Sequence, residues 1–385
     1  MKIILDFGFT IAGGVKPYFY DMMNYISSID KDNKYVIITT KNGYQLIKNF
    51  SFTNNIEFYI DEKLDNRIYR IYWEQFILPK FCNDNNADIL YCFNNRIPFK
   101  KMETKKIFLL GTLGPFIREY VDHFSFKERL SIKFLEFLIV KSLKNTDLTI
   151  FESHFTKDLV TNKYGFKGKA IVNHHGKPML NNHEDYNDID KIKIKYKLSS
   201  NYFLFTTYIR KYKKIEDLIK AYALAKKDFN KEIDFVLAGP IAPNEAKSYK
   251  QSLINLCEKY GVEDSFKFIG MVEGEELKIL MQNCYTYVFA SSYENLSYSL
   301  VEAISFGLPI ITTTATAMPE TCGDAALYYD PKDLNKLVSH MVSTVNNDEI
   351  IIDLKKKSLI RAKNFRNMED EIKFNLEIFN KIINE

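Results

Sequence analysis

The chain is poor in cysteine, and the cysteines that it has stand far apart. Disulfide-stapled domains and structural zinc sites need cysteines at short, repeated spacings. We therefore expect neither, and this usage is typical of a protein from a reducing cytoplasm. The five cysteines are Cys82, Cys92, Cys257, Cys284 and Cys322.

Long hydrophobic runs are missing as well. No apolar stretch approaches the roughly 20 residues that a membrane-spanning helix needs. The first residues, Met1–Asp6, indicate a strand and lack the apolar core and small-residue cleavage site of a secretory signal peptide. We expect the protein to be cytoplasmic.

The motifs of several enzyme classes are also absent. The sequence has no His-Glu-x-x-His metalloprotease motif, no P-loop, no Gly-x-Ser-x-Gly elbow and no Gly-x-Gly-x-x-Gly dinucleotide fingerprint. His174 and His175 are adjacent, but on an extended segment they point to opposite faces and do not chelate one metal. Asp188 and Asp190 fall in a presumed linker, and we treat their spacing as chance. The sequence predicts no metal site.

The chain has 385 residues, which are enough for two domains. Its charge is unevenly distributed between the two halves. The net charge is +4, but residues 1–180 hold 26 basic against 19 acidic residues, and the remainder holds 27 against 30. A basic N-terminal half suits an anionic membrane surface or a phosphorylated acceptor. A solvated basic face without a partner explains it equally well.

Short apolar runs alternate with helical patterns throughout. Strands that are almost entirely apolar, with helices between them, are typical of parallel sheets covered on both faces. Two such sets predict an α/β protein with two Rossmann-like domains. The predicted strands are Lys2–Phe7, Tyr35–Thr40, Ile56–Ile60, Ile89–Phe93, Ile107–Leu110, Leu148–Phe151 and Ala170–Asn173, then Tyr202–Thr206, Asp234–Ala238, Phe266–Ile269, Thr286–Ala290, Pro309–Thr313 and Ala326–Tyr329.

The predicted boundary between the domains is a polar stretch rich in Asn and Asp, Lys177–Asp190. We expect domains at 1–180 and 199–365, joined by a linker at 181–198. One long helical stretch is predicted at 349–383, and its last part, 366–385, is expected to pack back on the N-terminal domain.

Two glutamates stand at the end of one predicted strand. Glu294 lies in the loop after Thr286–Ala290, and Glu302 lies on the helix that follows. Ligands of open α/β sheets bind at the carboxyl ends of the strands. Carboxylates there suit the hydroxyl groups of a sugar or a ribose.

A cluster of cations follows the strand Tyr202–Thr206. It contains Arg210, Lys211, Lys213 and Lys214. Such a cluster suits a pyrophosphate, although a solvated basic loop is the common alternative. The two glutamates at the same sheet edge favour the ligand interpretation.

Glycines end several strands. Gly13 and Gly14 follow the first strand and open a helix, which indicates either close contact with a ligand or a tight turn. Gly239 and Gly270, the latter followed by Met271, end two more strands. Their backbone is suited to pass close to a planar base, although most strand-to-helix turns contain glycine.

The stretch Phe124–Asn145 predicts a long helix with a broad apolar face and mostly basic polar positions. Such a helix can lie on an anionic bilayer. More commonly it packs on the sheet. The apolar face consists of Leu130, Phe134, Phe137, Leu138 and Val140.

Taken together, these residues resemble the family 4 (group 1) glycosyltransferases, retaining enzymes of the GT-B fold. The resemblance covers nearly the whole chain, and the shared order of its motifs makes it specific. The strongest part is the pair Glu294 and Glu302 at the family's E-x₇-E spacing. The other matching segments are Gly307–Pro309, Pro319–Glu320, Gly323–Ala326, Gly13–Gly14, Trp73–Pro79, Ala87–Leu90, Phe155–Lys157, Tyr164–Gly165 and Lys213 ahead of Leu218–Ala221.

The resemblance implies a role for each candidate residue in a cleft between the two parallel sheets. Glu302 would hold the donor's ribose, and Glu294 would contact the transferred sugar. Lys213 and Arg210 would neutralise the leaving diphosphate. The resemblance further implies that the backbone of Asn295, Leu296 and Ser297 contacts the sugar or a phosphate. Gly239, Gly270 and Met271 would contact the donor. Gly13 and Gly14 would contact a phosphate or the acceptor.

The implied activity is retaining transfer of a sugar from a nucleotide-diphosphate sugar to a glycan or polyprenyl-linked acceptor. Capsule, exopolysaccharide or O-antigen (lipopolysaccharide) synthesis is the implied pathway. No metal, no cofactor and no nucleic-acid partner is implied, and peripheral contact with the cytoplasmic membrane fits the basic N-terminal half. A nucleotide-sugar epimerase and a non-catalytic sugar-binding subunit are the alternatives.

Three departures from the family pattern bear on activity. Asn295–Ser297 replaces the usual Gly-Phe-Gly. Tyr208 stands where an arginine is usual, and Arg210 is its displaced substitute. Gly111 and Thr112 replace a His-Asp pair, which puts the N-terminal domain's contact to sugar or acceptor in question.

Overall fold

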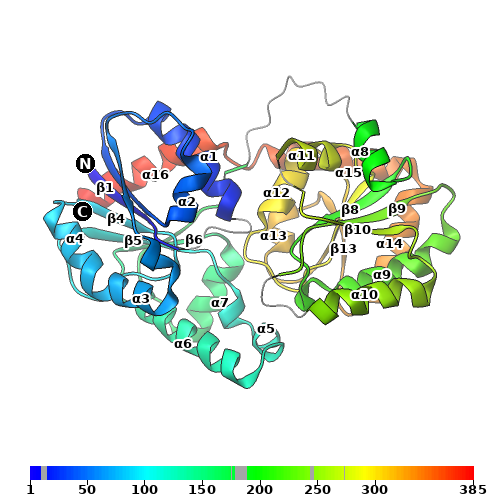
Figure 1. Cartoon of the computed structure of the whole chain (residues 1–385), viewed down its shortest axis with the longest axis horizontal. Coiled ribbons are helices and arrows are strands. Elements are labelled where there is room, and N and C mark those ends of the chain that lie inside the picture. Colours follow the sequence, from blue (N-terminus) through cyan, green and yellow to red (C-terminus); the bar gives the residue numbers. More distant parts are fainter. Residues whose placement is uncertain (10–14, 175, 178–188, 243–246, 273) are drawn as a thin grey trace. The chain divides into compact units, whose positions relative to one another are not determined.

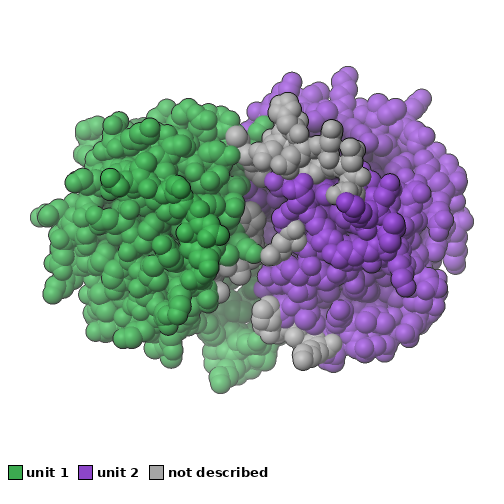
Figure 2. Space-filling view, turned by 45° about the horizontal axis from the view of Figure 1, so that its top comes forward, with its two compact units in different colours: residues 1–179, 366–385 green, residues 180–365 purple. Residues whose placement is uncertain are grey.

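The chain folds into two compact units. The computed structural model describes residues 1–9, 15–174, 176–177, 189–242, 247–272 and 274–385 (Figure 1). Unit 1 comprises Met1–Met179 and Arg366–Glu385, and unit 2 comprises Leu180–Phe365 (Figure 2). Gly13 and Gly14 lie outside the described residues, as do 181–188 of the predicted linker.

Within the described residues, unit 1 is built on a seven-stranded parallel sheet of order β3-β2-β1-β4-β5-β6-β7. The strands are almost entirely buried, as parallel strands covered on both faces must be, except at the two edges of the sheet, where β3 and β7 are only partly buried. They are β1 (Lys2–Phe7), β2 (Lys34–Thr39), β3 (Ile56–Ile60), β4 (Ile89–Cys92), β5 (Lys105–Leu110), β6 (Leu148–Phe151) and β7 (Ala170–Val172).

Unit 2 repeats the scheme with a six-stranded parallel sheet of order β10-β9-β8-β11-β12-β13, again within the described residues. The order reverses between β8 and β11, the two central strands. The strands are β8 (Tyr202–Thr206), β9 (Asp234–Ala238), β10 (Phe266–Gly270), β11 (Thr286–Phe289), β12 (Ile310–Thr313) and β13 (Ala326–Tyr329).

Helices cover both sheets (Figure 1). In unit 1 they are α1 (Val15–Ile29), α2 (Lys41–Ile47), α3 (Arg67–Tyr72), the π-helical turn η2 (Trp73–Ile77), α4 (Leu78–Asp84), α5 (Arg118–Asp122), α6 (Phe126–Leu143), α7 (His154–Tyr164) and α16 (Met368–Ile383). In unit 2 they are α8 (Ile189–Tyr196), the 3₁₀ turn η4 (Lys211–Lys213), α9 (Ile215–Ala225), α10 (Lys247–Tyr260), α11 (Gly274–Gln282), α12 (Tyr298–Ser305), α13 (Met318–Cys322), α14 (Leu334–Asn346) and α15 (Asp348–Ala362). Short 3₁₀ turns occupy Glu62–Asp65 (η1), Gly114–Phe116 (η3) and Lys226–Asp228 (η5).

The predicted fold class is confirmed. Every predicted strand occurs, and the strand ends differ from the prediction by at most two residues. The apolar pattern predicted the strands well because their side chains are buried on both faces of each sheet.

One helical prediction was wrong. The single stretch predicted at 349–383 is two helices, α15 and α16. The chain turns between them because Phe365 is buried and the Asn367 side chain caps α16 by accepting from the Asp370 N–H at 2.7 Å. The predicted linker contains α8, which packs against α11 of unit 2 through the buried Ile192.

The last helix, α16, belongs to unit 1. It packs on α1, and the rings of Tyr91 and Phe379 meet edge to face with centroids 5.6 Å apart. Asn173, just after β7, donates to Glu371 at 2.6 Å and accepts from Arg366 at 2.9 Å. Residues far apart in the sequence therefore complete one core.

A buried polar network lies where β1 and β4 end in unit 1. Glu74 accepts two hydrogen bonds from the guanidinium of Arg96, at 2.7 and 2.6 Å, and one from Asn94 at 2.9 Å. Asn94 also donates to Asp6 at 3.1 Å, and the Gly8 N–H donates to Asp6 at 2.9 Å. Because each of these side chains is at most 7% exposed, the network fixes the loops after both strands.

The network buries two carboxyl groups together with the guanidinium of Arg96, and Arg70 lies 3.9 Å from Glu74 beside them. Burial raises the pKa of Asp6 from 3.8 to about 7, and the nearby charge of Glu74 adds to the rise. The Gly8 N–H and the charge of Arg96 act in the opposite direction. Asp6 therefore titrates near neutral pH.

We predict that Asp6 makes stability depend on pH. The folded state holds the proton more tightly than the unfolded chain, whose Asp6 has a pKa near 3.8. The stabilisation is fully present below that value and is lost as pH rises to about 7. The melting temperature of the wild type should fall relative to that of Asp6→Asn as pH rises from about 5 to about 7. Asp32→Asn, at an exposed position, is the control. Parallel melting curves for wild type and Asp6→Asn at all pH values would contradict the assignment.

Candidate active site

The candidate site lies at the carboxyl edge of the unit 2 sheet. Strands β8 and β11 pair there in parallel, at the point where the strand order reverses. Loops that leave two such strands diverge and open a crevice, the usual ligand site of doubly wound sheets. The loop after β8 carries Arg210 and Lys213, and the loop after β11 carries Glu294–Ser297.

Lys213 and Glu294 come together across this edge. Their side chains form an ion pair and are only 10% and 20% exposed. Ser291 donates a hydrogen bond to the same carboxylate at 2.8 Å. The ammonium also lies over the rings of Tyr212 and Phe289, 5.1 and 5.4 Å from their centroids. The cation predicted for the diphosphate and the acid predicted for the sugar are therefore direct partners.

Thr316, in the loop after β12, holds the backbone of Glu294. The Glu294 N–H donates to its hydroxyl at 2.9 Å, and the hydroxyl donates to the Glu294 carbonyl at 2.8 Å. Thr316 has φ of +49°, a left-handed conformation that costs a β-branched residue energy. Such strain persists only where its surroundings enforce it, and here it anchors the acidic loop.

Two tyrosines join the loops after β8 and β11. The rings of Tyr212 and Tyr293 stack with centroids 4.8 Å apart. The Ser292 N–H donates to the Tyr212 carbonyl at 3.1 Å. The two loops therefore form one connected structure around Lys213 and Glu294.

Asn295, Leu296 and Ser297 continue the loop into α12. Asn295 and Ser297 are buried, and Leu296 packs against the unit 2 core. Ser297 occupies the N-cap position in extended conformation, and its hydroxyl lies 3.1 Å from that of Ser299. The N-terminus of α12, where helix dipoles favour anions, therefore opens onto this loop.

Glu302 lies on α12 near the same edge. Burial raises the pKa of Tyr287, and the negative charge of Glu302 raises it further, so the carboxylate lies near this phenol of β11. The Tyr287 hydroxyl is 2.6 Å from that of Thr206, the last residue of β8. Glu302 is thus associated with the β8–β11 junction.

Arg210 precedes the 3₁₀ turn η4, and its carbonyl accepts from the Lys213 N–H at 3.0 Å. Its side chain is half-buried and forms no ion pair with any described residue. Tyr208, at the position where the family usually has arginine, is half-buried.

The two predicted glycine contacts differ in kind. Gly239 has φ of +146°, and a Cβ atom there would overlap the carbonyl oxygen of Thr207, so packing between loops requires this glycine. Gly270 has φ of +77° and open space where a Cβ would lie, and Met271 is half exposed. Gly270 thus has room for a ligand beside it, whereas packing between loops is enough to explain the glycine at position 239.

In unit 1, Gly111 and Thr112 follow β5, as predicted. Both N–H groups donate to the side-chain oxygen of Asn95, at 2.8 and 3.0 Å. Asn95 has φ of +62°. An amide thus organises this loop in the absence of the family's His-Asp pair.

Sequence reasoning missed Ser291, Thr316 and the stacked tyrosines. Ser291 stands three residues before Glu294, and that spacing was a usable signal. Thr316 had none, because nothing in the sequence indicates its left-handed backbone.

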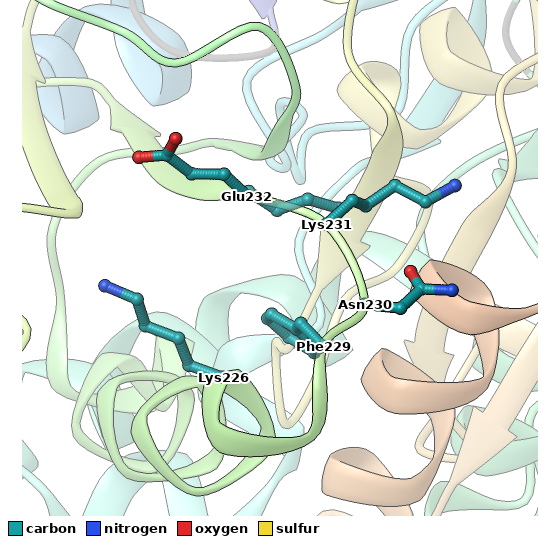
Figure 3. Close-up of a pocket in the computed structure, with 6 residues that line it drawn as sticks. Lys226, Phe229, Asn230, Lys231 and Glu232 are labelled. Carbon is teal, nitrogen blue, oxygen red and sulfur yellow. The ribbon is translucent and has the colours of Figure 1, made fainter.

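A separate pocket of about 340 Å³ lies at the opposite edge of the unit 2 sheet, before β9 (Figure 3). Its two lysines already have partners. Lys226 donates to Ser265 at 2.8 Å, and Lys231 pairs with Asp348 at 2.9 Å. This pocket therefore has no part in the candidate site. Its lining consists of Lys226, Phe229, Asn230, Lys231, Glu232 and Ile233.

No helix in the described ranges is both long enough and apolar enough to cross a membrane. In the same ranges, no three His, Cys, Asp or Glu side chains gather in a way that could hold a metal ion.

Known proteins resemble the chain in both sequence and fold. Residues 187–366 match the family Glycosyl transferases group 1. O-antigen chain mannosyltransferase B of Escherichia coli is 24% identical over 241 residues, 61% of this chain and 61% of that protein, so less than two thirds of that relative is spanned. O-antigen chain mannosyltransferase RfbU of Salmonella typhimurium is 25% identical over 300 residues, 78% of this chain and 73% of that protein.

Among solved structures, Anabaena HepE in complex with UDP and glucose has a TM-score of 0.71 at 14% identity, with 98% of this chain and 99% of that chain covered. This likeness shows a GT-B fold along almost the whole chain. The family match covers the sheet that carries Lys213, Glu294 and Glu302. The part of the chain that carries the candidate site, residues 187–366, therefore matches the group 1 glycosyl transferases.

Proposed function

We propose that the protein transfers a sugar, with retention, from a nucleotide-diphosphate sugar to a glycan or polyprenyl-linked acceptor in bacterial surface polysaccharide synthesis. The observation that carries the proposal is the Lys213–Glu294 pair beside Arg210 and the N-terminus of α12. These groups supply positive charge and a carboxylate at one ligand-binding edge. The two relatives are named O-antigen chain mannosyltransferases, which favours a mannosyl donor and an O-antigen type of acceptor.

The positive groups would stabilise the leaving nucleotide diphosphate. Negative charge develops on the diphosphate as the bond to the sugar breaks, and fixed cations and N–H groups stabilise it without reorganising. Lys213 and Arg210 are such cations, and the first turn of α12 offers N–H groups. A divalent ion is then unnecessary, so we expect activity to persist in the presence of a chelator.

The Lys213–Glu294 pair suggests how the site changes when the donor binds. A diphosphate competes with Glu294 for the ammonium group because it carries more negative charge. Once Lys213 turns to the phosphate, the carboxylate can accept hydrogen bonds from the sugar hydroxyls. Ser291 and Thr316 keep Glu294 in place during this exchange.

Glu302 would hold the ribose of the donor. A carboxylate can accept from both ribose hydroxyls at once. Gly270 and Met271 would face the base. The two relatives are named transferases, which favours transfer over an epimerase or a non-catalytic subunit.

Glu302→Ala should weaken donor binding by about 10- to 100-fold, the usual effect of losing charge-assisted hydrogen bonds. The measurement is a thermal-shift titration with UDP-, GDP-, ADP- and CMP-sugars. Glu232→Ala removes an exposed glutamate of the same unit and should bind like the wild type. If the ligand raised the melting temperature of Glu302→Ala as much as that of the wild type, the assignment of Glu302 to the ribose would be wrong.

Lys213→Met should lower kcat by about 100- to 1000-fold, because the leaving group loses its cation. The same change leaves Glu294 without its ammonium partner and should cost about 1–3 kcal/mol of stability. Adding Glu294→Gln should restore much of the stability but none of the activity.

The control for this series is Lys227→Met, which removes an exposed lysine of unit 2. Sugar transfer at wild-type rates by Lys213→Met would show that the ion pair is only structural.

A further inference from the structure

Helix α6 exposes large apolar side chains to solvent. Phe126, Leu130, Phe134 and Phe137 are 78%, 54%, 50% and 59% exposed. Their spacing of four, four and three residues places them on one side of the helix. The sequence predicted one apolar face, but Leu138 is buried in unit 1, so α6 has an inner and an outer apolar side.

A second exposed row follows α3 into the π-helical turn η2. Ile68, Tyr72 and Phe76 are 81%, 53% and 70% exposed and are spaced four residues apart. The ring centroids of Tyr72 and Phe76 lie 5.3 Å apart. Sequence reasoning missed this row because the same segment also buries Trp73 and Glu74.

The two rows lie on neighbouring helices (Figure 1). At one end, Arg67 of α3 donates to the Ser131 hydroxyl of α6 at 2.6 Å. At the other end, Gln75 donates to the Ile97 carbonyl at 3.0 Å, and the Ile97 N–H donates to Ser142 of α6 at 3.2 Å. We call the exposed residues of both rows the α3–α6 surface: Ile68, Tyr72, Phe76, Phe126, Leu130, Phe134 and Phe137.

Basic side chains share the outer side of α6. At 3.6 residues per turn, Lys133 and Lys141 fall within the same arc of about 100° as the apolar residues. Both are exposed, as is Lys144 at the helix end. Large single apolar side chains on a surface are ordinary, but two adjacent rows with lysines on the outer side of α6 are typical of an interaction surface.

The acidic residues of α6 are engaged elsewhere. Glu128 accepts from the N–H and hydroxyl of Ser125 at 3.0 and 2.6 Å in a capping box. Glu136 pairs with Lys163 at 3.0 Å and accepts from Tyr164. On α3 and η2 the acid is Glu74, which is buried against Arg96. The outer side is therefore apolar and positive.

We propose that the α3–α6 surface docks on an anionic lipid bilayer. The apolar side chains would enter the headgroup region, and the lysines would meet the lipid phosphates. A second copy of the chain is a poorer occupant, because a symmetric contact would bring the lysines of both copies together. The proposal rests on the proposed function, because docking on a bilayer would bring the enzyme to a lipid-linked acceptor.

Vesicle co-sedimentation tests the proposal without donor or acceptor. The protein should bind phosphatidylcholine vesicles that contain phosphatidylglycerol and should bind pure phosphatidylcholine much less. Phe134→Glu/Phe137→Glu should weaken binding at least about tenfold, because apolar area is lost and negative charge is added. Lys133→Gln/Lys144→Gln should weaken it about fivefold for each charge removed.

Matched controls come from unit 2. Ile194→Glu and Ile352→Glu place the same charge at side chains that are 78% and 67% exposed, and both should bind vesicles like the wild type. Phe76→Glu tests the α3 row by itself and should also weaken binding. All variants should keep the rise in melting temperature that the donor induces. A loss of vesicle binding can then be told apart from a loss of donor binding.

Three results would overturn the proposal. One is the absence of binding to anionic vesicles. Another is equal binding to vesicles with and without phosphatidylglycerol. The third is a dimer in solution that Phe134→Glu/Phe137→Glu dissolves, because the surface would then belong to a contact between copies.

Discussion

The parallel pairing of β8 with β11 is the constraint on which the candidate site depends. It sets two loops side by side that are about 80 residues apart in the sequence, and one brings Lys213 while the other brings Glu294. Both side chains are largely buried, so removing either would leave the other without its ion-pair partner. The stacked tyrosines and the Thr316 hydrogen bonds support this arrangement from both sides. The site is therefore held in shape before any ligand binds.

Much of this architecture could be predicted from the sequence, and the reason is physical. Strands buried on both faces are apolar throughout, so their pattern does not depend on tertiary detail. Glu294 and Lys213 could be assigned to one sheet edge because each follows such a strand. Their direct pairing could not be predicted, since it depends on how two loops fold. The left-handed backbone of Thr316 and the inward turn of Glu74 depend on contacts from distant segments, and no local pattern indicates them.

In both units, polar groups at the carboxyl edge of the sheet join the loops there, but the groups differ. In unit 2, Lys213 and Glu294 at the sheet edge form an ion pair that joins two loops. In unit 1, the corresponding edge is filled by a network of its own, in which Asn94 and Arg96 satisfy Asp6 and Glu74. Asn95 likewise occupies the N–H groups of Gly111 and Thr112. Polar groups at the carboxyl edge thus hold the loops of each sheet together.

Helix α16 gives the chain a particular order of assembly. Unit 2 is continuous in sequence, whereas unit 1 is interrupted by it, and Tyr91 meets Phe379 only after all of unit 2 has been made. During synthesis from the N-terminus, unit 2 can bury its core while one side of the unit 1 sheet still lacks α16. The half-finished sheet would expose the apolar surface around Tyr91 for that interval. The unit that is translated first is therefore the last to complete its core.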